Sequence, residues 1–193
     1  MTDQRPTIIT QRLCLRPFRL SDAADVTRLA GDERVAATTL NLPHPYPEVL
    51  ANQWIASQED NFTTRKSLVL AICHRIDGYL IGAIGLTIKH ELDNAELGYW
   101  ISAEFWNSGY ATEAAYAMTK FGFENLYLHK IFAHYFAGND SSGRVMQKIG
   151  MKEEGFLRQH VKHHGHYADL HLYGFLQADL VQPPLTPVEI LFP

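Results

Sequence analysis

The spacing of apolar residues changes several times along the chain, and each change predicts a different kind of element. Stretches that alternate apolar and polar residues, or that are short and rich in β-branched and aromatic residues, predict strands. Apolar residues three and four positions apart predict helices. On these patterns, strands are predicted at 7–19, 67–74, 79–89, 95–101, 130–136, 156–161 and 167–176. Helices are predicted at 23–30, 48–62, 112–125 and 141–149.

Glycine and proline mark where these elements end or bend. Prolines at three of the five positions 43–47 fix φ and remove hydrogen-bond donors, so this segment is predicted to be irregular. Asp77-Gly78 is a turn signal that joins two neighbouring strands into a hairpin. Gly82 and Gly85 lie inside the second of these strands, where they predict a bulge or a close approach of another backbone.

The order of the predicted elements is β α α β β β α β α β β, which indicates a mixed α/β or α+β fold. No repeat or low-complexity linker interrupts it, so residues 1–193 are expected to form a single domain. Four prolines in 181–193 predict an extended C-terminal tail. No apolar run approaches the roughly 18 residues of a membrane-spanning helix. Residues 1–6 carry no hydrophobic signal segment, and a cytoplasmic location is expected.

Composition narrows the range of functions. Apolar residues make up 46% and charged residues 20% of the chain, as is usual in soluble globular proteins. The formal charge of −4 argues against a protein that binds nucleic acid without regard to sequence, because phosphate contacts need a basic surface. Cys14 and Cys73 lie in apolar strand segments without a C-x-x-C partner, which excludes a zinc site of the cysteine type. Both thiols are expected to be buried and reduced.

The segment 96–114 carries the most chemical information. Its strand is followed by a short loop that leads directly into a predicted helix. Small residues at Ser108, Gly109 and Ala111 leave the backbone N–H groups accessible, and a helix N-terminus adds unpaired donors and a partial positive charge. Together these features predict a site for a phosphate or diphosphate. The absence of G-K-[ST] and of G-x-G-x-x-G excludes a Walker loop and a dinucleotide-binding fold.

Six motifs follow one another along the chain: Thr10-Gln11-Arg12-Leu13-Cys14-Leu15-Arg16-Pro17-Phe18, Glu96-Leu97-Gly98-Tyr99-Trp100-Ile101, Trp106-Asn107-Ser108-Gly109-Tyr110-Ala111-Thr112-Glu113, Asn139-Asp140-Ser141-Ser142, Lys148-Ile149-Gly150-Met151 and Gly165-His166-Tyr167-Ala168-Asp169. In this order they resemble the GNAT acetyltransferase superfamily, and within it the RimJ/RimL type of ribosomal-protein N-terminal acetyltransferases. The resemblance implies an acetyl-CoA-dependent transfer of acetyl to a primary amine. It also implies an N-acetyltransferase domain at 8–178. The implied fold is a mixed, mostly antiparallel central sheet of about seven strands flanked by helices, with a splayed cleft between the fourth and fifth strands.

The resemblance also assigns the residues that would bind the cofactor. The diphosphate of coenzyme A would bind the backbone N–H groups of 108–112, and the pantetheine arm would lie along the preceding strand as an added strand does. Asn139 would hydrogen-bond the same arm or cap its helix, and Trp100 would contact the cofactor or pack in the core. The implied cofactor-binding residues are Trp100, Ile101, Ser108, Gly109, Tyr110, Ala111, Thr112, Asn139 and Arg144.

The phosphate loop departs from the family pattern in its charge. Most members carry Arg or Lys there, whereas this chain has Asn107 and Ser108. Positive charge for the phosphates must then come from elsewhere. Arg144 and Lys148 on the following helix are the candidates, and the alternative is that they form only a solvated helix face.

Three residues are candidates for proton transfer. Glu96 stands in an otherwise apolar strand and matches the superfamily's catalytic glutamate, although a surface ion pair would also explain it. His134 on the next strand is a second candidate base, with a structural role as the alternative. Ser142 matches the serine of the family's N-x-x-S motif and is the candidate acid, or else an ordinary residue of a helix N-terminus. Val161 stands where RimL-type enzymes carry a further glutamate.

The sequence leaves the acceptor open. A peptide or protein N-terminus is the first hypothesis. A small amine such as a polyamine, amino acid or aminoglycoside is the second, favoured by Glu91, Asp93 and Glu96 near the expected acceptor side. A non-catalytic acyl-CoA-binding module is the third. The four histidines within 160–166 lack a carboxylate or cysteine partner, so no metal is expected. Neither nucleic acid nor a membrane is expected as a partner, and the chain is expected to be a monomer or homodimer.

Overall fold

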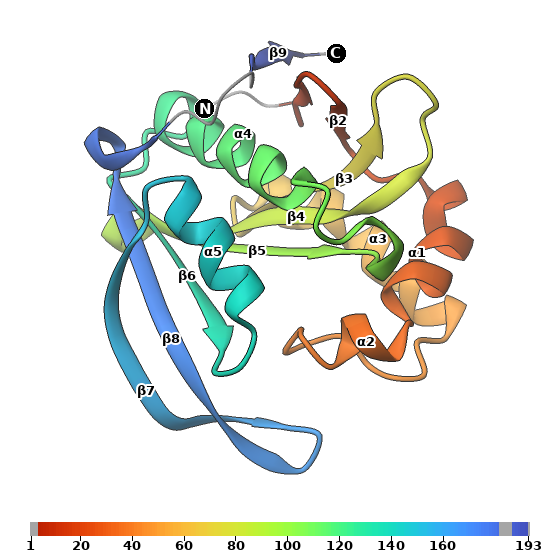
Figure 1. Cartoon of the computed structure of the whole chain (residues 1–193). Coiled ribbons are helices and arrows are strands. Elements are labelled where there is room, and N and C mark those ends of the chain that lie inside the picture. Colours follow the sequence, from red (N-terminus) through yellow and green to blue (C-terminus); the bar gives the residue numbers. More distant parts are fainter. Residues whose placement is uncertain (1–3, 182–186, 193) are drawn as a thin grey trace.

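The computed structural model describes residues 4–181 and 187–192. Within these residues, nine strands form one open sheet in the order β7-β8-β6-β5-β4-β3-β2-β1-β9 (Figure 1). Neighbouring strands are antiparallel except β5 and β6, which run parallel. The strands are β1 (Thr7–Ile9), β2 (Leu13–Arg16), β3 (Ser67–His74), β4 (Leu80–Lys89), β5 (Asn94–Ile101), β6 (Lys130–Phe136), β7 (Lys152–His163), β8 (His166–Leu176) and β9 (Glu189–Leu191). The described α-helices are α1 (Ala23–Ala30), α2 (Glu33–Ala36), α3 (Glu48–Thr63), α4 (Tyr110–Asn125) and α5 (Asp140–Lys148).

Helices cover both faces of the sheet, and each face has its own hydrophobic core. On one face α4 and α5 pack against the central strands, with Phe121 and Ile131 fully buried between them. On the other face α1, α2 and α3 pack on β3 and β4 through residues such as Val26, Ile55 and Ala71. Burial of a large apolar side chain contributes about 1.5–3 kcal/mol, so these two cores hold the sheet between its helices. The mixed α+β fold is confirmed.

The sheet opens between β5 and β6. The two strands pair only at their first residues, with Asn94 opposite Lys130, Ala95 opposite Ile131 and Glu96 opposite Phe132. Beyond these pairs β5 runs on to Ile101 against β4 alone, and β6 runs on to Phe136 against β8. The two strands therefore diverge as a wedge. These are the fourth and fifth strands of the prediction, so the predicted splay is confirmed.

The ends of the sheet differ from the prediction. The single strand predicted at 7–19 is wrong, because the chain turns back on itself at Thr10, whose hydroxyl accepts from the Leu13 backbone N–H at 3.0 Å. This turn makes β1 and β2 an antiparallel pair. The C-terminal segment adds β9, which pairs with β1, so the sheet has nine described strands rather than about seven. The parts of the predicted tail at 182–186 and 193 lie outside the described residues.

Two local predictions concern glycine and cysteine. A Cβ at Gly82 would lie 2.1 Å from the Trp100 carbonyl oxygen, so the close backbone approach predicted there is confirmed. The register of β3 and β4 also shifts next to Gly82, as a bulge requires. Cys14 and Cys73 are free thiols opposite each other on β2 and β3. Cys73 is buried, which raises its pKa to about 11, and Cys14 is half-buried.

Within the described residues, the helices are all too short or too polar to cross a bilayer.

Candidate active site

A cavity of about 460 Å³ opens where β5 and β6 separate. Its walls are the end of β5, the loop and first turn of α4, the start of α5, and α2 with the segment after it. The lining residues are Val35, Thr38, Thr39, Tyr99, Trp100, Ile101, Phe105, Trp106, Asn107, Gly109, Tyr110, Ala111, Thr112, Asn139, Ser141, Ser142, Arg144, Val145 and Lys148. All the predicted cofactor-binding residues except Ser108 are among them.

The loop between β5 and α4 presents main chain to this cavity. Asn107 and Gly109 have φ values of 60° and 80°, and Gly109 is the N-cap of α4. A left-handed N-cap without a side chain leaves the N–H groups of the first helical turn uncovered. Trp106 fixes the loop, because its Nε1 donates to the Ile101 carbonyl oxygen at 2.7 Å. The result is a concave surface of N–H donors at the positive end of a helix.

The end of β5 supplies an open strand edge. Residues 99–101 pair with β4 on one side, and the pairing with β6 stops at Glu96 on the other. The indole of Trp100 packs in the core under α1 and α3, so core packing correctly describes this side chain. Trp100 is also among the residues that line the cavity. An extended ligand segment can pair with such an edge.

The start of α5 forms the opposite wall. Asn139 occupies the N-cap position without a side-chain capping bond, and its Oδ1 accepts from the Ser141 hydroxyl at 2.7 Å. Arg144 and Lys148 lie one helical turn apart, so they share a face, and both line the cavity from exposed positions. The cavity thus brings two cations to a loop that has none.

A hydroxyl pair bridges β5 and α5 inside the cavity. The Tyr99 hydroxyl lies 3.1 Å from Ser142 Oγ and also donates to the Ser142 carbonyl oxygen at 3.4 Å. Burial raises the pKa of Tyr99 to about 12, opposed by the hydrogen bond with Ser142. The phenol therefore stays protonated at neutral pH and can donate a hydrogen bond.

The two candidate bases meet on the other face of the sheet. Glu96 Oε1 lies 3.2 Å from His134 Nδ1, across the last paired residues of β5 and β6. The hydrogen bond from His134 lowers the pKa of Glu96, burial opposes this, and the charges of His134 and Lys89 add to the lowering. Side chains alternate between faces along a strand, so Glu96 and Tyr99, three positions apart, point to opposite faces. Neither Glu96 nor His134 lines the cavity, and the structure does not bring them to Ser142.

The end of the cavity next to α2 is closed by segments far apart in the sequence. Val35, Thr38 and Thr39 line it. The tip of the β7–β8 hairpin reaches the same place, where His163 Nε2 lies 3.2 Å from the Thr39 carbonyl oxygen and its ring stacks on Phe136. In the part of the chain that the structure describes, His, Cys, Asp and Glu side chains form no group of three that could hold a metal ion.

A family model for the acetyltransferase (GNAT) domain matches residues 12–152. The chain belongs to the GNAT acetyltransferase family. It is 30% identical over 175 residues to the uncharacterized N-acetyltransferase YoaA of Bacillus subtilis, covering 89% of this chain and 97% of YoaA. A GNAT-family acetyltransferase from Bacillus anthracis has a similar structure, with 27% identity, a TM-score of 0.79 and coverage of 89% and 99% of the two chains. RimJ of Mycobacterium smegmatis, solved with a CoA disulfide, shares the fold at 24% identity and a TM-score of 0.81, covering 92% of each chain.

This GNAT protein is an acetyl-CoA-dependent N-acetyltransferase, and its cavity fits that donor. Gly109 has the left-handed conformation of a bare N-cap, and residues 99–101 keep an unpaired strand edge. Cations from α5 face the same space. The loop N–H groups and the α5 cations suit a diphosphate, and the open edge of β5 suits an extended arm with amide groups.

Sequence reasoning did not find the Tyr99 side chain or the wall formed by Thr38 and Thr39. Tyr99 looks like one more aromatic residue of a buried strand, and its partner is 43 positions away. The two threonines follow α2, a helix that the apolar spacing did not predict. A run of hydroxyl residues just before a proline-rich loop was the one available signal.

Proposed function

We propose that this GNAT enzyme acetylates the N-terminal amine of a peptide or protein by direct attack within a ternary complex. The observation that carries the proposal is that one cavity is lined by the loop before α4, by the Tyr99–Ser142 pair and by the wall next to α2. A donor held at one end would present its thioester at the splay. An acceptor amine would reach it from the other end.

The donor would be held mostly by main chain. The N–H groups of 108–112 would bind the diphosphate, and Arg144 and Lys148 would balance its charge. The pantetheine arm would pair with the edge of β5 at Trp100 and Ile101, with Asn139 as a further hydrogen-bond partner. Such contacts fix the thioester in one place, which is the main requirement for attack by a bound amine.

The proton transfers would be divided between the two faces of the sheet. An α-amino group has a pKa near 8, so it must lose a proton before it attacks. Glu96, oriented by His134, would accept this proton through a water, since neither side chain lines the cavity. The amine nitrogen forms the new bond to the acetyl carbon, and the carbon–sulfur bond breaks. Ser142, supported by Tyr99, would stabilise the departing thiolate.

Peptide acceptors are favoured over small cations by the position of the acidic residues. Glu91 and Asp93 lie before the first residue of β5, whereas the cavity lies at the far end of that strand. Neither these two residues nor Glu96 lines the cavity, so they do not form the acidic wall that the sequence suggested for a small cationic acceptor. The motifs shared with RimJ/RimL-type enzymes point the same way.

The test is the release of the coenzyme A thiol from acetyl-CoA in the presence of a panel of amines. Peptides with a free N-terminus should support turnover, and the same peptides with a blocked N-terminus should not. Turnover confined to polyamines, amino acids or aminoglycosides would instead establish the small-amine alternative. Tight binding of coenzyme A without turnover on any member of the panel would indicate a non-catalytic acyl-CoA-binding module.

A further inference from the structure

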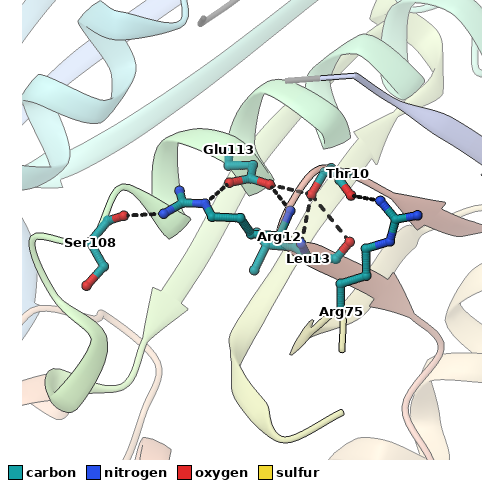
Figure 2. A network of polar contacts seen from close by, with 6 residues as sticks. All are labelled: Thr10, Arg12, Leu13, Arg75, Ser108 and Glu113. Atoms are coloured by element: carbon teal, nitrogen blue, oxygen red, sulfur yellow. Dashed lines mark hydrogen bonds and ion pairs between the residues drawn. The ribbon is translucent and has the colours of Figure 1, made fainter. Parts of the chain in front are cut away.

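A polar network ties the N-terminal strands to the phosphate loop (Figure 2). Arg12 lies in the turn between β1 and β2. Its Nε donates to Glu113 Oε2 at 2.7 Å, and its Nη1 donates to the Ser108 carbonyl oxygen at 2.8 Å. One guanidinium thus hydrogen-bonds both the loop and the first turn of α4, which lie about a hundred positions away in the sequence.

Glu113 is the acidic centre of this network. It is only 5% exposed and lies in the first turn of α4. Its carboxylate accepts from the Thr10 hydroxyl at 2.6 Å and from the Arg12 backbone N–H at 2.8 Å, in addition to the guanidinium. A buried carboxylate at this place would repel a diphosphate bound at the same helix terminus. Its ion pair with Arg12 at 2.7 Å removes that repulsion.

Arg12 also shapes the outer side of the loop. Its guanidinium carbon lies 4.6 Å from the centre of the Tyr110 ring, a cation–π contact. A Cβ at Gly109 would lie 3.3 Å from Arg12 Nη2. In a trans peptide the carbonyl and the next N–H point in opposite directions, so holding the Ser108 carbonyl turns the Gly109 N–H away from Arg12. Gly109 lines the cavity and Arg12 does not.

We propose that Arg12 is a positioning residue for the diphosphate of acetyl-CoA. It turns the loop N–H groups towards the ligand and neutralises Glu113 from behind the loop. This role partly replaces the cation that the loop lacks at Asn107 and Ser108, and it rests on the proposed binding of the diphosphate there. Arg12 does not line the cavity, so its effect should be confined to donors that carry the diphosphate.

The decisive comparison uses two donors, acetyl-CoA and acetyl-pantetheine, which lacks the diphosphate. In Arg12→Gln, the KM for acetyl-CoA should rise roughly 10- to 100-fold, because the Glu113 charge is left unpaired beside the ligand. The kcat at saturating acetyl-CoA should change much less, and kcat/KM for acetyl-pantetheine should stay at the level of the unaltered enzyme. An equal loss with both donors would mean a merely structural role and would overturn the proposal.

Three further variants separate charge from shape. Arg12→Gln combined with Glu113→Gln should recover part of the lost acetyl-CoA affinity, because the unpaired charge is gone. Arg12→Lys should keep more affinity than Arg12→Gln, since it retains the charge, and it serves as the test if Arg12→Gln does not fold. Arg75→Gln is the matched control: Arg75 Nη1 donates to the Thr10 carbonyl oxygen at 3.0 Å in the same turn, without a bond to the loop (Figure 2).

The outcomes also distinguish this inference from the proposed function. If the unaltered enzyme does not bind coenzyme A in calorimetry, the proposed function fails. If the unaltered enzyme binds it and Arg12→Gln binds it equally well, only the role of Arg12 is overturned. An Arg75→Gln variant that loses acetyl-CoA affinity as strongly as Arg12→Gln would also overturn it, because the effect would then belong to the turn as a whole.

Discussion

Two pairs of polar side chains flank the splay between β5 and β6, and their surroundings differ. Glu96 and His134 lie on the face of α1–α3 with 43% and 24% of their side chains exposed, and the pKa of Glu96 is lowered. Tyr99 and Ser142 lie on the face of α4 and α5, where burial raises the pKa of the phenol to about 12. The Glu96 carboxylate is ionised at neutral pH and the Tyr99 phenol is protonated, whereas all four residues are partly buried.

This difference indicates how one sheet can separate two proton transfers. A carboxylate with a lowered pKa is ionised throughout the neutral range, so it is present in its proton-accepting form. A phenol with a raised pKa stays protonated, so it is always ready to donate a hydrogen bond. When neighbouring groups have their pKa values pushed apart in this way, the pattern favours separate base and acid roles.

The largest expected effect is the loss of donor binding, which would leave no thioester between the two pairs. Gly109→Asp adds a negative charge at the helix terminus, and its Cβ would lie 3.3 Å from Arg12 Nη2, so the new carboxylate would compete with Glu113 for the guanidinium. We expect this change to weaken coenzyme A binding by at least roughly 100-fold. Calorimetry with coenzyme A measures this directly. Gly78→Asp is the control for backbone strain, since Gly78 has a similar φ of 74° in the β3–β4 turn with open space around it. Unchanged affinity in Gly109→Asp would refute the loop as the diphosphate site.

The second prediction concerns the Glu96–His134 pair. Glu96→Gln should lower kcat by roughly 100-fold at pH 7, where most of the acceptor amine is protonated and needs a base. At pH 9 most of the amine is already neutral, so the loss should be much smaller. Because the pKa of Glu96 is lowered, its carboxylate is ionised at both pH 7 and pH 9. The smaller loss of kcat at pH 9 must therefore come from deprotonation of the amine.

Its control is Glu91→Gln, which removes an exposed carboxylate that precedes β5 and does not line the cavity, and should leave the pH profile unchanged. Equal losses in Glu96→Gln at pH 7 and pH 9 would exclude Glu96 as the base. The contrast between the two faces of the sheet would then have no catalytic meaning.

Local patterns predicted most of the scaffold on which these pairs stand. Strands at 67–74 and 130–136 have the predicted bounds, because each is a short apolar run between turn signals. The glycine of the loop and the start of α4 within two residues followed from helix-terminus chemistry. The splay and the roles expected of Asn139 and Ser142 came only from the resemblance to a family, whereas Glu96 was also singled out as a carboxylate in an apolar strand.

The contacts between side chains far apart in the sequence could not be predicted from local patterns. Tyr99 meets Ser142 across 43 positions, and Arg12 meets Glu113 across 101, so no local period contains either contact. The split of the first strand at Thr10 was missed for a related reason. A threonine in an alternating run fits a strand, and the turn becomes visible only through its bonds to Leu13: the Thr10 hydroxyl accepts from the Leu13 N–H and the Thr10 N–H donates to the Leu13 carbonyl oxygen.

The smallest expected effect tests the neutral pair. Tyr99→Phe removes one hydroxyl, keeps the ring, and leaves Ser142 Oγ without the partner that lies 3.1 Å away. We expect kcat to fall about tenfold, which corresponds to about 1.4 kcal/mol in the barrier, with no change in the KM for acetyl-CoA. Because the phenol is protonated at both pH values, the loss should be the same at pH 7 and pH 9, unlike that of Glu96→Gln. Tyr127→Phe, at a side chain that is 78% exposed, is the control. A loss in Tyr99→Phe that disappears at pH 9 would assign this pair to the amine instead of the thiolate, and the division of labour between the two faces would be wrong.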